Sequence, residues 1–297
     1  MFVLMWLPVL LVSCIRDELP PCPPLSLHVG VADYNYCNAG SFADEPIKPE
    51  QAPLSTYVKS VAWHIVDVQT GRVVAEQHVF PASGRVVAEQ HVFPASDTAC
   101  QATINLPADL PFGKYAVTVW GGLENETELP AILPLDEAGD PYLVCDTVQY
   151  DAWHYDHTLL LKRVKSKLHI EVENLPPQYH AAALSITETG VFAGVDDKFC
   201  YKGECVMRNS SRFAGTEGDT HTILPPSVAR NATRVSIGIY DENGRLVPQL
   251  APTDVVTTLY RNTITGLRYV YDTEKKGYDI YVRINDEWEA AHTLDIE

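Results

Sequence analysis

The thiols are the side chains whose type and spacing indicate chemistry in this sequence, and one of them stands apart. Cys14 ends an uncharged apolar run that covers residues 1–13. The run is too short to span a bilayer, which takes about 20 apolar residues, and it has the length of a signal-peptide apolar core, about 7–15 residues. This position predicts an exported chain with a reactive thiol at its processing site.

The residues before this thiol indicate what happens to it. Leu11-Val-Ser-Cys14 resembles a bacterial lipobox. In this interpretation residues 1–13 are a lipoprotein signal peptide, and Cys14 becomes the N-terminus with acyl chains on its sulfur and its new amino group. A covalent lipid is then expected and no cofactor. A signal peptide normally carries Lys or Arg before its apolar core, and this sequence has neither there. A translation start upstream of Met1 is therefore left open. The alternative is a buried strand or helix, but four prolines follow within residues 20–24 and would interrupt either element.

The other six cysteines form an even number, which permits disulfides in an exported chain. Cys200 and Cys205 are the candidate pair, because Gly203 between them allows a tight reversal. Two free thiols on a loop are the alternative. The sequence does not pair the remaining four, which are Cys22, Cys37, Cys100 and Cys145.

No metal site and no catalytic residue is predicted. His154 and His157 have H-x-x-H spacing, but no third ligand is evident, and an ordinary linker or strand edge is the preferred interpretation. The motifs of serine hydrolases, zinc proteases, P-loop proteins and dinucleotide-binding proteins are absent from the sequence. The net charge of −17 disfavours binding to nucleic acid and to anionic lipid. Membrane attachment is therefore expected from the lipid.

The sequence after residue 24 predicts β-strands. Apolar residues alternate with polar or small ones, and long stretches of helical periodicity are absent. Prolines and glycines lie mostly between the apolar runs, a pattern typical of sandwiches and barrels. The predicted strands lie at residues 25–31, 58–68, 102–106, 114–120, 168–172 and 280–284.

Two similar hairpins indicate two related domains. Each has an aspartate followed by Gly-Arg and two apolar residues, at Asp67 and at Asp241. Between them, residues 146–157 are polar and aromatic without clean periodicity. We therefore predict a tether over residues 14–24, an N-terminal domain over residues 25–150 and a C-terminal domain over residues 151–297, each a β-sandwich or a barrel that unfolds cooperatively by itself.

A tandem duplication interrupts the first hairpin. Residues 71–83 recur without change as residues 84–96. Strand side chains alternate between two faces, so an odd insertion of thirteen residues cannot leave one continuous strand in register. We expect residues 73–80 to form the hairpin strand, and residues 84–96 to form a protruding loop or an edge extension.

Several segments together resemble one family, the fimbrillin-A-associated anchor proteins of type V fimbriae, which are outer-membrane lipoproteins. Arg16, Asp17 and Glu18 resemble the signal that sends such lipoproteins to the outer face. The other similar segments are Cys14 to Pro23, with its second cysteine at Cys22, Leu110 to Gly122, Leu159 to Pro176 and Tyr278 to Trp288.

The resemblance implies an all-β chain of two consecutive transthyretin-like (Greek-key) β-sandwich domains. It implies a non-catalytic subunit in the outer membrane, exposed at the cell surface, that anchors a fimbrial shaft and helps to terminate its growth. The partner would be a shaft subunit, with no nucleic acid and no small-molecule substrate.

Two other classes remain as alternatives. A surface glycan-binding lipoprotein would also be acidic, exported and rich in strands, and it would present tryptophans and tyrosines on one concave face. Trp120 and Trp288 lie in or beside predicted strands, where packing is the preferred role. A lipid-anchored hydrolase is disfavoured by the missing nucleophile motifs. The tryptophans that a glycan site could use are Trp63, Trp120, Trp153 and Trp288.

Overall fold

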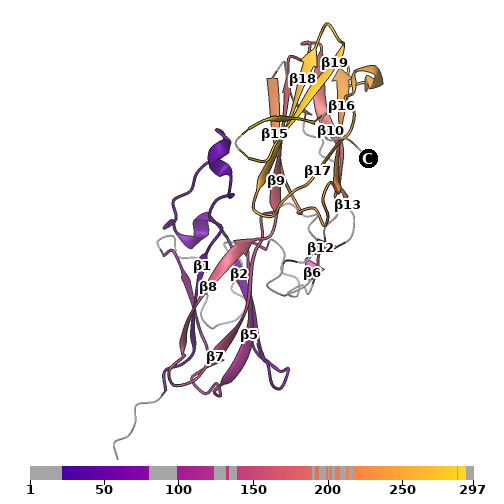
Figure 1. The fold of residues 1–297 in the computed structure, drawn as a ribbon. Coiled ribbons are helices and arrows are strands. Elements are labelled where there is room, and N and C mark those ends of the chain that lie inside the picture. Colours follow the sequence, from indigo (N-terminus) through magenta and orange to yellow (C-terminus); the bar gives the residue numbers. More distant parts are fainter. Residues whose placement is uncertain are drawn as a thin grey trace, which may run out of the picture.

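The computed structural model forms two β-sandwich domains stacked end to end (Figure 1). Over the residues it describes, the only helices are three short 3-10 turns, and none of them has the length or apolar character to cross a membrane. The described residues are 22–79, 99–123, 132–133, 139–188, 191–193, 199, 201–202, 205–207, 212–213, 217–285 and 287–291.

Domain 1 is one curled sheet with the strand order β3-β2-β5-β7-β8-β1-β4. β7 and β8 pair at only two positions, so the sheet folds over there and β4-β1-β8 faces β3-β2-β5-β7. Apolar residues on the inward phase of both faces fill the space between them. The strands are β1 (Ser26–Val31), β2 (Val61–Asp67), β3 (Val73–Val79), β4 (Ala102–Asn105), β5 (Gly113–Gly121), β7 (Tyr142–Tyr150) and β8 (Asp156–Arg163).

Domain 2 has two sheets around a second core. One has the order β15-β9-β18-β19-β20, and the other has the order β13-β10-β16-β17 with β14 also paired to β10. The strands are β9 (Ser166–Glu173), β10 (Tyr179–Glu188), β13 (Cys205–Met207), β14 (Arg212–Phe213), β15 (Glu217–Leu224), β16 (Thr233–Asp241), β17 (Val255–Thr257), β18 (Ile264–Asp272), β19 (Gly277–Arg283) and β20 (Glu289–Ala290).

The two domains share one topology. In domain 1, β1 pairs antiparallel with β4 and parallel with β8. In domain 2, β9 pairs antiparallel with β15 and parallel with β18. The order β3-β2-β5-β7 likewise matches β13-β10-β16-β17. The predicted fold class, all-β with two consecutive Greek-key sandwiches, is confirmed.

The sheet pairing moves the domain boundary from residues 150–151 to Val164–Lys165. β8 follows the predicted boundary in the sequence, yet it pairs with β1 in domain 1 from Ser26↔Asp156 onward. The segment 146–157 is the end of β7, a turn and the start of β8, rather than a linker. Its polar pattern belongs to an exposed turn. Both residues at the actual crossover are buried, so a protease has little access there.

The first repeat copy forms the hairpin strand, as predicted. β3 pairs antiparallel with β2, and the turn has Gly71 at φ +67° with the Asp67 carboxylate accepting two backbone N–H groups. Phe80 and the second copy lie outside the described residues.

The second hairpin is shorter, and its position differs. After Asp241 the chain turns at Gly244, which has φ +75°, and forms a single bridge between Tyr240 and Leu246 before β17. The first hairpin lies between β2 and β3, whereas the second lies between β16 and β17, which are not equivalent connections. The similar sequences therefore reflect similar turn chemistry, and the kinship of the domains rests on their topology.

Candidate functional site: the joint between the domains

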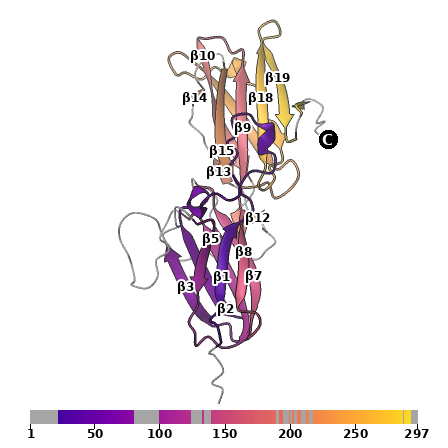
Figure 2. The ribbon, with the colours of Figure 1, turned by 90° about the vertical axis from the view of Figure 1, so that its left-hand side faces the viewer.

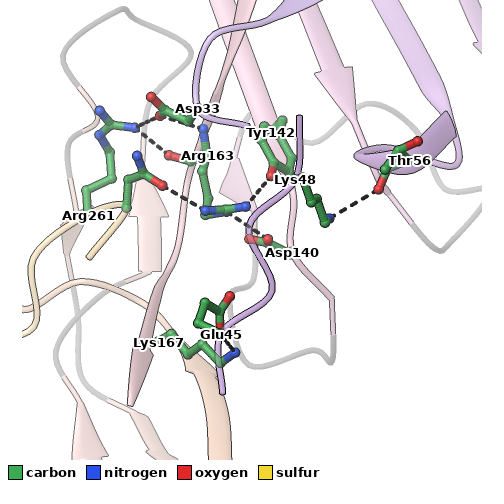
Figure 3. A network of polar contacts seen from close by, with 10 residues as sticks. Asp33, Glu45, Lys48, Thr56, Asp140, Tyr142, Arg163, Lys167 and Arg261 are labelled. Atoms are coloured by element: carbon green, nitrogen blue, oxygen red, sulfur yellow. Dashed lines mark hydrogen bonds and ion pairs between the residues drawn. The ribbon is translucent and has the colours of Figure 1, made fainter. Parts of the chain in front are cut away.

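A buried arginine lies at the centre of the joint between the two domains (Figure 3). Arg163 ends β8, where the inward phase of the strand runs Leu159, Leu161 and Arg163. Its Nε donates to Asp140 Oδ2 at 2.8 Å, and its Nη1 donates to Asn262 Oδ1 of domain 2 at 2.8 Å. Its Nη2 donates to the hydroxyl of Tyr142. One guanidinium thus joins the two domains.

Burial and neighbouring charges have opposite effects on the pKa values of Arg163 and Asp140. Burial raises the pKa of Asp140, and the neighbouring Arg163 only partly offsets that rise. Burial disfavours the charge of Arg163, but Asp140, Tyr142 and Tyr36 outweigh it, so the arginine pKa lies above its ordinary value. The guanidinium also lies over the Tyr36 ring, 3.9 Å from the ring centroid. A buried charge in this setting is stable only while all of its partners stay in place.

A second arginine, on the domain 2 side, completes this contact. Arg261 donates to Asp33 of domain 1 at 2.5 Å and to the backbone carbonyl of Arg163 at 2.7 Å. The same Asp33 carboxylate accepts the backbone N–H of Arg163 at 3.0 Å. Asp33 is the second residue after β1, so the end of β1 is fixed to both domains.

A strap from domain 1 then reaches the sheet of domain 2. The strap is the β1–β2 connection, residues 32–60, with the 3-10 turns η1 (Ala39–Ser41) and η2 (Leu54–Thr56). The Asn38 amide donates to the carbonyls of Ile264 and Ile284, at 2.8 and 2.7 Å, and its oxygen accepts the Ile264 N–H at 2.9 Å. One side chain thereby satisfies backbone groups of β18 and of the segment after β19.

The strap also makes an apolar contact and an ion pair with domain 2. Phe42 is buried, and an added Cβ at Gly266 would lie only 3.1 Å from Phe42 Cε1, so glycine is needed for this close approach. Glu45 forms an ion pair with Lys167 on β9, and both side chains are largely buried. The strap is therefore seated on β9 and β18.

A small sheet closes the other side of the joint. β6 (Ile132–Leu133) comes from domain 1, and it pairs with β11 (Val191–Ala193), which pairs with β12 (Tyr201–Lys202). Tyr201 donates to the Val164 carbonyl at 2.6 Å. Tyr201 also packs with the cluster around Trp120 on the outer face of the β2-β5-β7 sheet. The joint therefore holds domain 1 from two sides.

These contacts give the joint a mechanical role. Arg163 and Arg261 each contact both domains through hydrogen bonds and ion pairs, so the site can resist bending and separation of the domains. Within the described ranges, no group of three or more His, Cys, Asp or Glu residues could hold a metal ion. The joint residues were missed from the sequence because their partners lie in other segments. The available signal was Arg163 on the inward phase of an apolar strand.

The predicted site residues fall largely outside the described residues. This holds for Cys14, for the signal Arg16, Asp17 and Glu18, and for Cys200. Cys205 begins β13, opposite Glu188 of β10, and nothing is described of its side chain. The Cys200–Cys205 disulfide therefore stays a prediction.

The cysteines left unpaired by the sequence lie in separate places. Cys22, Cys37 and Cys100 are exposed thiols. Cys37 Sγ lies 3.1 Å from Thr263 Oγ1, within the joint. Cys145 lies on β7, opposite Thr118 of β5. Among these four no disulfide is formed.

The two histidines of the H-x-x-H spacing turn to different partners. His154 Nδ1 lies 2.9 Å from an Asp151 carboxylate oxygen, and His157 Nε2 lies 2.9 Å from the Gln149 carbonyl. Both belong to the β7–β8 turn and the strands beside it.

The tryptophans do not gather on one face. Trp63 and Trp120 are buried in two different clusters, and Trp153 is exposed on the β7–β8 turn. Trp288 packs over Gly266, with Arg268 4.2 Å from its ring centroid. The packing roles expected for Trp120 and Trp288 are confirmed, and the four rings form no common platform.

Comparison with known proteins supports the fold. No protein-family model and no curated protein matches this sequence. A candidate adhesin from Bacteroides thetaiotaomicron has a similar solved structure, with a TM-score of 0.55 and 13% identity over 92% of this chain and 99% of that one. A candidate polysaccharide-binding protein from the same species matches with a TM-score of 0.50 and 15% identity, over 90% of this chain and 98% of that one.

A named fimbrial protein is also among the similar structures. The fimbrial anchor protein Mfa2 from Porphyromonas gingivalis matches with a TM-score of 0.46 and 11% identity, over 89% of this chain and 98% of that one. At these identities the likeness to solved structures is one of fold. The chain has the all-β architecture of candidate bacterial adhesins along almost its whole length.

Proposed function

We propose that this protein is a non-catalytic outer-membrane lipoprotein that anchors a fimbrial shaft and helps to terminate its growth. The observation that carries the proposal is the joint, which fastens two sandwiches into one elongated body. The chain enters this body at the end of domain 1 away from the joint, a few residues after Cys14. A tether between lipid and shaft needs this arrangement, because tension must pass through both domains.

The lipid supplies the attachment in this proposal. Each buried CH₂ of an acyl chain contributes about 0.8 kcal/mol, so one chain alone holds marginally and several chains hold firmly. A net charge of −17 offers no basic patch that could hold the protein on anionic lipid instead. Arg16, Asp17 and Glu18 would direct the lipoprotein to the outer face.

The proposed binding partner is a subunit of the fimbrial shaft. Strand addition gives main-chain hydrogen bonds and fills side-chain pockets, and it suits polymers of β-sandwich subunits. A subunit that is tied to lipid at its N-terminus cannot be passed along a growing shaft. Anchoring and termination would therefore follow from one modification at Cys14.

The test replaces Cys14 and uses Cys22 as its matched control. Cys22 is an exposed thiol eight residues further along, so Cys22→Ala should leave acylation unchanged. Cys14→Ala should abolish incorporation of labelled palmitate, move the protein out of the membrane fraction and release fimbriae into the medium. An unmodified Cys14 in the mature wild-type protein would refute the proposal.

Two further measurements test the export signal and the glycan-binding alternative. Replacing Asp17 and Glu18 by Ala should reduce the accessibility of the protein to protease added to whole cells. In a polysaccharide pull-down we expect no retention. Retention that is lost in Trp153→Ala would favour the glycan-binding class instead.

A further inference from the structure

The end of domain 1 farthest from the joint carries an exposed apolar patch. We call it the tip patch, and it comprises Val68, Val73, Phe112, Trp153 and Tyr155. Among the described residues, ten large hydrophobic side chains are exposed, and these five are half of them. Trp153 is 86% exposed, so folding alone gives no reason for its ring. Clustered exposure of this kind marks an interaction surface.

Backbone pairing brings the tip patch together. The N–H of Val68 donates to the Lys114 carbonyl at 3.0 Å, which places the β2–β3 turn beside the start of β5. Phe112 precedes that strand, and its ring lies 5.1 Å from the Tyr150 ring at the end of β7. Trp153 and Tyr155 follow in the β7–β8 turn. The three connections lie at the same end of domain 1 (Figures 1 and 2).

The N-terminal segment enters the domain at this same end. The Tyr150 hydroxyl donates to the Pro23 carbonyl at 3.0 Å, and the Ser26 N–H donates to the Tyr155 carbonyl at 2.8 Å. Cys22 lies eight positions after Cys14 in the sequence, and the backbone between them spans at most about 29 Å when extended. If Cys14 is acylated, Cys22 therefore lies within that distance of the acylated residue, and the chain enters domain 1 at the end that carries the tip patch.

Its composition matches the zone between lipid headgroups and acyl chains. Tryptophan and tyrosine favour this zone, because their rings are apolar with one polar atom. The same connections carry no basic excess that would require an anionic lipid. Their charged residues, apart from His154, are Asp67, Arg72, Asp109, Lys114, Asp151 and Asp156.

We propose that the tip patch inserts into the lipid headgroup region of the membrane, so that domain 1 stands directly on the bilayer. This inference rests on the proposed lipidation of Cys14, which brings the tip to the membrane. The inserted patch would then restrict tilting of the elongated body relative to the membrane, while the acyl chains keep the protein attached to it.

The test measures the depth of Trp153 in vesicles. Acylated full-length protein is placed in phosphatidylcholine vesicles with or without bromine on the acyl chains, since bromine quenches tryptophan at short range. We expect wild-type emission to fall in brominated vesicles, and Trp153→Tyr to remove most of that fall. Trp153 is too exposed for this substitution to disturb the fold.

Two variants in the Trp153→Tyr background serve as matched controls. Val73→Trp returns a tryptophan to the tip patch and should restore quenching. Leu246→Trp places one on the exposed Asp241 turn of domain 2, at the end away from the joint, and should remain unquenched.

The result distinguishes this inference from the proposed function. Absence of acylation on Cys14 would refute the lipoprotein itself. Acylated, vesicle-bound protein with an unquenched Trp153 would refute only the membrane contact of the tip, and it would assign the patch to a protein partner.

Discussion

The two domains have the same strand order, yet only one of them makes the strap. In domain 1 the connection between the first two strands is residues 32–60, and it crosses to domain 2. In domain 2 the equivalent connection is residues 174–178 and stays within its own domain. The ladders therefore set the fold of each domain, while a single long connection sets how the domains are joined.

The equivalent strands β8 and β18 end in opposite environments. Arg163 lies two residues beyond the last β1–β8 pair, and Asp272 lies two residues beyond Val270, the last residue of β18 paired with β9. Arg163 is buried in the joint, whereas Asp272 ends its strand in an exposed turn and accepts the N–H groups of Glu274 and Lys275. The same place in the topology thus carries a buried charge at the joint and a solvated charge at the end of domain 2 away from the joint.

Removing the buried charge should have the largest effect. Arg163→Met leaves the Asp140 carboxylate buried without its ion-pair partner, and breaking such a pair costs about 3–5 kcal/mol of unfolding free energy. Urea denaturation measures the loss. The control Asp272→Asn keeps the oxygen that caps its turn and should leave the unfolding free energy close to that of the wild type.

A second variant sharpens that test. Asp140→Leu combined with Arg163→Met also removes the carboxylate that would be left without an ion-pair partner. The double variant should therefore recover much of the unfolding free energy that Arg163→Met loses. Burial already raises the pKa of Asp140, and loss of the arginine raises it further. The folded state then binds the proton more tightly than the unfolded state, so the deficit of Arg163→Met should shrink as the pH falls. A deficit that does not change with pH would contradict this account.

Close packing at two glycines should give an intermediate effect. An added Cβ at Gly266 would lie 2.9 Å from Trp288 Cη2, and one at Gly121 would lie 2.8 Å from Val58 Cγ1. Each substitution to Ala should cost about 1–3 kcal/mol through overpacking. Gly266→Ala should also increase hydrogen exchange in the strap, because Phe42 must move. Gly40→Ala has nothing within 4 Å of its Cβ and should be neutral.

The turn aspartates should have a smaller, pH-dependent effect in both domains. Backbone N–H groups, those of Gln69 and Arg245 first, hold the pKa values of Asp67 and Asp241 below their ordinary range. Their contribution to stability is therefore present above the unfolded pKa, about 4, and is lost as the pH falls through the folded pKa. Asp67→Asn and Asp241→Asn should each flatten the acid limb of a stability–pH curve. An unchanged acid limb would show that these turns do not contribute.

Deleting residues 84–96 should have the smallest effect. The first copy already forms β3, so the fold, the thermal midpoint and membrane attachment should stay nearly unchanged. Because the copies are identical, deletion of either gives the same chain. Circular dichroism melting is the measurement. Unfolding of domain 1 in this variant would show that both copies are built into its core.

Local sequence patterns were sufficient to predict several strands and the turn of the first hairpin. Alternation with a period of two follows from the pleat, so Leu27 and Val29 predict the inward face of β1 without knowledge of its neighbours. Turns likewise depend on local chemistry, as with Asp67 and Gly71. The all-β character and the use of the first repeat copy followed from such local rules, whereas the two Greek-key sandwiches were implied by the family resemblance.

Which segments pair or pack together became clear only from the folded chain. β1 pairs with β8 across about 130 residues, and this pairing moved the domain boundary. Asn38 contacts Ile264 across 226 residues, and Arg163 meets Asn262 across 99. No local pattern specifies such contacts, because a partner is chosen by which faces can be buried together and which buried charges can be satisfied.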